Sequence, residues 1–103
     1  MSKYNAIKTE VDGYIFASRR EAARYSELRI LEKAGEIIDL ELQPHYPCTV
    51  NGKLICKYIA DFRYTSVKRG NVVIEDAKGF KTPVYRLKKK MVEAIYNIII
   101  IEV

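Results

Sequence analysis

Several features that would identify common classes of protein are scarce or missing in this 103-residue sequence. There are two cysteines, Cys48 and Cys56, and one histidine, His45, and their spacing matches no common zinc pattern. The longest apolar run, Ile98–Ile101, is far shorter than the roughly 18 residues that a membrane span needs. Met1–Glu10 lacks the apolar region of a secretory signal. We therefore expect reduced cysteines, no membrane partner and a cytoplasmic location, which is the host cytoplasm if a phage encodes the protein.

Linkers rich in proline and glycine, internal repeats and low-complexity tracts are also missing, so we predict one domain over residues 1–103. Hydrophobic residues make up 49% of the chain and charged residues 30%, a balance that argues against wholesale disorder. The formal net charge of +5 mildly favours a polyanionic partner. Many basic proteins bind nothing acidic, so composition alone leaves nucleic-acid binding open.

Local signals predict two helices. Residues 18–21 form a capping box, in which a serine accepts a hydrogen bond from a free backbone N–H and a glutamate reaches back. This helix should end near Ala34, because the glycine that follows can adopt the left-handed conformation of a helix stop. Thr82–Pro83 should open a second helix that runs to about Tyr96, since proline at the first position loses no helical hydrogen bond.

Extended segments precede and separate these helices. The first few residues should be loose, and a tight turn at 11–14 should join two short extended pieces. The expected strands are 37–42, a hairpin around Asn51-Gly52 that continues as one long strand over 54–64, then 72–78 and finally 98–103. The order helix, three strands, helix, strand predicts an α/β fold with a central mixed sheet flanked by helices.

The turn at 68–71 determines which side chains meet on this sheet. If the turn is centred on its first two residues, Asp61 lies opposite Asp76; if it is centred on its second and third, Asp61 lies opposite Lys78. Directly opposed residues share a sheet face, and so do residues two apart. Either register therefore puts all three side chains on one face, whereas a register offset by one residue would separate them.

Two carboxylates and a lysine on one sheet face indicate a site for a divalent cation, because like charges directly opposite each other destabilise a sheet. Mg²⁺ prefers oxygen ligands and typically uses one or two carboxylates with substrate phosphate and water. Asp61, Asp76 and the backbone carbonyl of Ala77 could supply those ligands. Lys78 could orient or help deprotonate the attacking water and offset charge on the phosphate. The alternative is a charge ladder on a solvated sheet face.

Glu21 is a further candidate for this site. On a helical wheel it lies close to Tyr25 and Leu28, and a glutamate among core-facing residues is unexpected unless it has a function. The capping box offers a structural role for the same side chain. The helix therefore leaves both interpretations open.

Three segments together resemble the signature of the PD-(D/E)XK nucleases, namely Phe16–Glu21 (FASRRE), Tyr58–Phe62 (YIADF) and Ile74–Gly79 (IEDAKG). The arrangement of helix glutamate, strand aspartate and acid-x-lysine is similar to phage junction-resolving endonucleases and to the endonuclease subunit of some transposases. From about Phe16 to Val103 the chain also looks like a family of small phage and prophage proteins. Ala60 stands where the superfamily motif has proline, a departure that is frequent in this superfamily.

This resemblance implies a restriction-endonuclease-like core and a Mg²⁺- or Mn²⁺-dependent DNA endonuclease. Glu21, Asp61 and Asp76 would be the metal-binding acids and Lys78 the catalytic lysine, whereas Glu75, one residue off, would face away. The substrate would be branched, Holliday-junction-like or duplex DNA in phage recombination or DNA processing, cut by a homodimer. The alternative function is a non-catalytic DNA-binding module on the same fold.

A cationic run in the second helix favours contact with DNA phosphates, because such side chains fix the register of a duplex. The predicted DNA-binding residues are Lys81, Tyr85, Arg86, Lys88 and Lys89. We expect Lys81 and Lys88 to contribute more than Arg86, because charges spread around a helix cannot all face one groove. The alternative is a solvated helix face. Gln43 and His45 are interpreted as strand-end residues.

Overall fold

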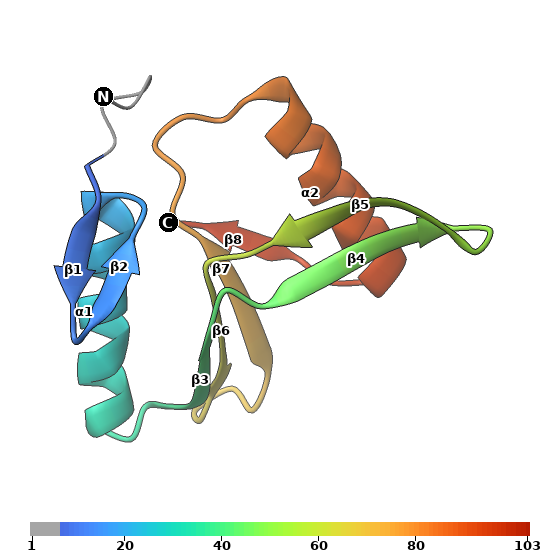
Figure 1. Cartoon of the computed structure of the whole chain (residues 1–103). Helices are drawn as coiled ribbons and strands as arrows, with labels where there is room; N and C mark the ends of the chain where they lie inside the picture. Colours follow the sequence, from blue (N-terminus) through green and yellow to red (C-terminus); the bar gives the residue numbers. More distant parts are fainter. Residues whose placement is uncertain (1–6) are drawn as a thin grey trace.

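The computed structural model describes residues 7–103, so the prediction for the first few residues lies mostly outside the described part of the chain. The elements in chain order are β1 (Thr9–Val11), β2 (Tyr14–Phe16), α1 (Arg19–Lys33), β3 (Ile37–Leu42), β4 (His45–Val50), β5 (Lys53–Ile59), β6 (Phe62–Ser66), β7 (Val72–Asp76), α2 (Pro83–Tyr96) and β8 (Ile100–Glu102) (Figure 1). Within residues 7–103, neither helix is long and apolar enough to cross a membrane.

The central sheet contains four strands in the order β3-β6-β7-β8. β6 is antiparallel to both β3 and β7, and β8 is parallel to β7 because the chain returns through α2. The predicted mixed α/β architecture is thus confirmed, since three strands of this sheet lie between the helices and one follows the second helix.

The two faces of the sheet carry two separate hydrophobic cores. One core packs α1 residues such as Leu28 against Phe62 and Tyr64 of β6. The other packs Val92 of α2 against Ile74 of β7 and against the β4-β5 hairpin. This division follows from strand geometry, because neighbouring residues along a strand point to opposite faces. The two helices accordingly lie on opposite sides of the sheet (Figure 1).

Both helices begin and end close to the predicted positions. The Ser18 side chain accepts a hydrogen bond from the backbone N–H of Glu21 at 3.1 Å, and that of Thr82 accepts one from Tyr85 at 3.0 Å. Gly35 follows α1 with a φ of +77°, a left-handed conformation that costs a glycine little. The local sequence signals therefore determine where these helices start and stop.

The prediction of one long strand over 54–64 is wrong. The chain leaves β5 at Ile59 and enters β6 at Phe62, and the two strands belong to different sheets. At the break, the buried Ala60 donates its N–H to the carbonyl of Pro44, and the Asp61 carbonyl accepts from Gln43. The two crossing segments thus form backbone hydrogen bonds with each other. The chain can therefore pass from one sheet to the other without leaving buried N–H or carbonyl groups unpaired.

Two other predicted strands are shorter than expected, since β7 ends at Asp76 and β8 covers only Ile100–Glu102. The hairpin around Asn51-Gly52 is confirmed, but β4 and β5 form their own two-stranded sheet, which projects from the central one beside α2 (Figure 1). Cys48 and Cys56 face each other across this hairpin as free cysteines.

Candidate active site

The register of β6 against β7 brings two of the predicted acids together. Phe62 is paired with Glu75, so the next pair towards the strand end is Asp61 and Asp76, which is the first of the two registers predicted from the turn. The backbone N–H of Asp61 donates to Asp76 Oδ1 at 3.1 Å, and the backbone N–H of Ala77 donates to Asp61 Oδ2 at 2.7 Å. These reciprocal bonds fix both carboxylates at the end of the strand pair.

Glu21 reaches the same place from the first turn of α1. Its side chain is only 5% exposed and shares a hydrogen bond with the Asp61 carboxylate. Burial, followed by the charge of Asp61, raises the pKa of Glu21 to about 7, although Lys78 and a backbone hydrogen bond at Ala17 act in the opposite direction.

Asp76 and Lys78 complete the cluster. Asp76 is fully buried, and burial raises its pKa to about 6 despite the nearby lysine. Lys78 Nζ lies 3.8 Å from Asp76 Oδ1 and 5.5 Å from the centre of the Tyr85 ring. The structure therefore brings together all four residues that the sequence predicted for the site.

The donor set of this cluster suits a hard divalent cation. Two buried carboxylate oxygens, Glu21 Oε1 and Asp76 Oδ2, have no hydrogen-bond partner, which is rare and costly for buried polar atoms. Among residues 7–103, no three His, Cys, Asp or Glu side chains are arranged as a ready-made metal cage. Mg²⁺ needs no such cage, because it usually takes one or two carboxylates and completes its shell with water and phosphate.

The raised pKa values predict how the stability of the metal-free protein changes with pH. Asp76 and Glu21 bind more protons in the folded state than in the unfolded chain, so the free energy of unfolding should fall as pH rises from about 4 to about 7. A shift of about two pKa units corresponds to roughly 3 kcal/mol. Urea unfolding in EDTA at both ends of this range measures the effect.

The matched variant for this experiment is Glu21→Gln combined with Asp76→Asn, which should flatten the pH dependence. Glu41→Gln, at an acid whose side chain is 54% exposed, is the control and should leave the dependence unchanged. If the double variant retains the wild-type pH dependence, the two buried acids do not cause it.

Glu75 is a buried residue whose partners the sequence did not reveal. As predicted, it faces away from Asp61 and Asp76, but it is only 2% exposed and lies against α1. Arg24 donates to it from Nε and Nη2, both at 2.7 Å, and the Tyr64 hydroxyl donates to it as well. The only signal in the sequence was an acid within the predicted strand 72–78.

The predicted DNA-binding residues do not form one surface. A groove of about 400 Å³ is lined by Lys81, Arg86, Lys89, Lys90, Glu93 and Glu102. In it, Lys81 lies 3.4 Å from Glu102 and Lys89 lies 3.3 Å from Glu93. Tyr85 donates its hydroxyl to Glu102 at 2.8 Å and faces Lys78. Lys88 instead lies on the hairpin side of α2, where its charge acts on Cys48.

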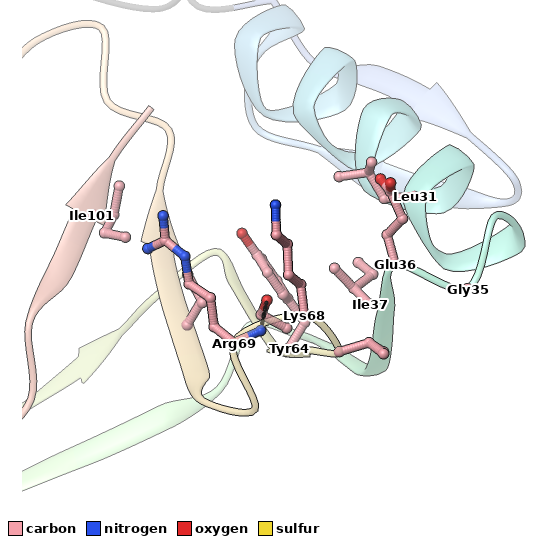
Figure 2. Close-up of a pocket in the computed structure, with 11 residues that line it drawn as sticks. Leu31, Gly35, Glu36, Ile37, Tyr64, Lys68, Arg69 and Ile101 are labelled. Atoms are coloured by element: carbon pink, nitrogen blue, oxygen red, sulfur yellow. Dashed lines mark hydrogen bonds between the residues drawn. The ribbon is translucent and has the colours of Figure 1, made fainter.

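A second pocket, of about 470 Å³, lies on the α1 side of the sheet, between the end of α1 and β8 (Figure 2). Leu31, Ile37, Tyr64 and Ile101 give it apolar walls, and Lys68 extends over it from the β6–β7 turn. None of the four candidate active-site residues lines it. It is therefore a separate feature of the fold.

Comparison with known families places the chain. A family model described as "Protein of unknown function (DUF1064)" matches residues 1–102, which is nearly the whole chain. No curated protein and no solved structure matches this chain.

Proposed function

We propose that this chain, which belongs to that DUF1064 family, is a metal-dependent DNA endonuclease of the PD-(D/E)XK type with a restriction-endonuclease-like core. The observation that carries the proposal is the meeting of three buried acids, Glu21, Asp61 and Asp76, with the partly exposed Lys78. Glu21 lies in α1, Asp61 directly precedes β6, Asp76 ends β7 and Lys78 follows it, so separate parts of the chain supply the site. The buried oxygens Glu21 Oε1 and Asp76 Oδ2, which have no hydrogen-bond partner, are groups that a divalent cation would satisfy.

Each residue has a distinct role in this proposal. The carboxylates of Glu21, Asp61 and Asp76, with the carbonyl of Ala77, would hold Mg²⁺ or Mn²⁺, one or two of the carboxylates directly and the rest through water. When bound, the cation would polarise the phosphate and make a water molecule more acidic. Lys78 would orient that water and offset the negative charge that develops on the phosphate. Attack of the water on phosphorus would break the bond between phosphorus and the 3′ oxygen. The 3′ oxygen would take a proton and become a 3′-hydroxyl, and the phosphate would stay on the 5′ end of the other product.

DNA is the substrate that the surface charge favours. Lys81, Arg86 and Lys89 lie in the groove beside α2. Lys78 lies between this region and the acid cluster, because its ammonium group contacts both the Tyr85 ring and Asp76. Cationic side chains grouped in this way bind the phosphate backbone without regard to base sequence. Branched or duplex DNA in phage recombination or DNA processing fits a small enzyme that reads shape rather than sequence.

A homodimer belongs to the same proposal, because one active site cuts one strand. Exposed apolar side chains on α2 would suit such an association, since Val84 and Leu87 are 61% and 62% exposed. A second copy of the chain would then place a second acid cluster at the opposite strand.

The test of the proposed function is a cleavage assay on labelled four-way junction, flap, duplex and single-stranded DNA. The protein should cut at least one of these with Mg²⁺ or Mn²⁺ and none of them with EDTA. Binding without cleavage in either metal would favour the non-catalytic DNA-binding module instead. Neither binding nor cleavage would contradict both functions.

The basic groove makes a separate prediction about affinity. Lys81→Ala should weaken DNA binding and flatten the plot of log affinity against log salt by about one unit, because one phosphate contact is lost. Lys88→Ala should do the same if DNA also contacts the hairpin side of α2. Binding is measured in Ca²⁺, so that cleavage is suppressed.

Lys33→Ala, at an exposed position in the last turn of α1, is the matched control and should keep the wild-type slope. If both Lys81→Ala and Lys88→Ala also keep that slope, the DNA is bound elsewhere on the protein. If only Lys81→Ala changes it, the groove rather than the hairpin side faces the DNA.

A further inference from the structure

The side chains of Arg24, Tyr64 and Glu75 form a hydrogen-bonded network on the α1 side of the sheet, next to the acid cluster. Glu75 precedes Asp76 on β7, and Arg24 lies three residues after Glu21 on α1, about one helical turn away. The bidentate bond between them, with both contacts at 2.7 Å, therefore joins the turn of α1 that carries Glu21 to the part of β7 that carries Asp76. Among residues 7–103, it is the ion pair that links α1 to the central sheet.

Glu21 needs such a link because its position is unfavourable. Its carboxyl group is only 5% exposed and lies beside Asp61, between α1 and the start of β6, and burying a carboxyl group costs free energy. A small movement of the first turn of α1 away from the sheet would return Glu21 to water and separate it from Asp61. A strong contact one turn further along the helix opposes that movement.

The form of the contact also matters. A buried ion pair is a poor way to gain stability, since desolvation of both ions offsets much of their attraction. What a planar guanidinium with two parallel hydrogen bonds provides is a fixed orientation. The Tyr64 hydroxyl, also bonded to Glu75, keeps the carboxylate from turning. Apolar packing through Leu28 already holds α1 on the sheet, so the attachment of the helix does not require the polar network.

We infer that Arg24, Glu75 and Tyr64 are positioning residues, which hold Glu21 against Asp61 so that the two acids can share one cation. This inference rests on the proposed function for its purpose, but the geometric part of it concerns the metal-free protein alone. Partners behind metal ligands commonly change metal affinity or activity by about 10- to 100-fold when they are altered.

The test uses Arg24→Lys, which keeps the charge and loses the two-pronged geometry. Arg29→Lys on the same helix, where the arginine pairs with Glu32 and Asp12, is the matched control. Calorimetric titration with Mn²⁺ should show about tenfold weaker binding for Arg24→Lys and wild-type binding for Arg29→Lys. Circular dichroism confirms that each variant is folded, and Glu75→Gln replaces Arg24→Lys if the latter does not fold.

A metal-free crystal structure of the same variant separates this inference from the proposed function. In Arg24→Lys, the Glu21 carboxylate should have moved away from Asp61, whereas in Arg29→Lys it should not. If Glu21 keeps its place, or if a folded Arg24→Lys binds Mn²⁺ as the wild type does, the inference is wrong. If the wild type itself neither binds Mn²⁺ nor cuts DNA, the proposed function fails, and the displacement of Glu21 alone decides whether the network positions it.

Discussion

Replacing Lys78 with alanine should lower the cleavage rate by about 100- to 1000-fold, a typical cost of losing one group that stabilises charge in the transition state. Lys78 is 31% exposed and lies 3.8 Å from Asp76, so it can approach a phosphate at the acid cluster from the solvent side. Its loss should leave the affinity for Mn²⁺ nearly unchanged, because an ammonium group is no metal ligand. Single-turnover cleavage and calorimetric titration measure the two quantities separately.

The control for this variant is Lys68→Ala, which removes an exposed lysine from the β6–β7 turn. It should cleave at the wild-type rate. A Lys78→Ala protein that cleaves as fast as this control would remove the lysine from the mechanism. Loss of Mn²⁺ binding in a folded Lys78→Ala protein would show that the residue organises the acids rather than the substrate.

Replacing Asp61 with asparagine should abolish both metal binding and cleavage. The amide oxygen can still accept the hydrogen bond from the Ala77 N–H, and the backbone N–H of residue 61 can still donate to Asp76, so the fold should survive. What is lost is the negative charge that a divalent cation needs at the centre of the cluster. We expect Mn²⁺ affinity to fall by more than tenfold and cleavage to become undetectable.

Asp39→Asn is the matched control, since Asp39 is an exposed strand aspartate with a left-handed φ of 57° that asparagine tolerates. It should bind Mn²⁺ and cut DNA as the wild type does. An Asp61→Asn protein with unchanged Mn²⁺ affinity would contradict the assignment of Asp61 as a ligand, whatever its cleavage rate.

The features that sequence predicted well are those set by short-range rules. Ser18 and Thr82 cap helices because their hydroxyl oxygens accept from backbone N–H groups three residues ahead. The turn at 68–71 fixes the register of β6 and β7, and that register alone brings Asp61 opposite Asp76. The core of the candidate site could thus be predicted because it depends on one turn.

The features that sequence did not predict depend on contacts between distant segments. The break at Ala60–Asp61 exists because Gln43 and Pro44 cross the same point, and nothing in the alternation of residues 54–64 indicates that crossing. The bond between Arg24 and Glu75 joins residues 51 positions apart. Likewise, the sequence predicts that the cationic run divides around α2, but the position of Lys88 on the hairpin side depends on where the β4-β5 hairpin packs. Periodicity describes one element at a time and cannot show these pairings.

The measurement that tests the central claim most directly is a ligation-coupled nicking assay on a labelled four-way junction with Mn²⁺. Hydrolysis by the proposed mechanism leaves a 5′-phosphate and a 3′-hydroxyl, so DNA ligase should reseal the nicks made by the wild type. Asp61→Asn should make none, and EDTA should suppress the wild type to the same level. Absence of nicking by the wild type, nicks that ligase cannot reseal, or equal nicking by Asp61→Asn would each contradict the claim that this acid cluster is a metal-dependent nuclease site.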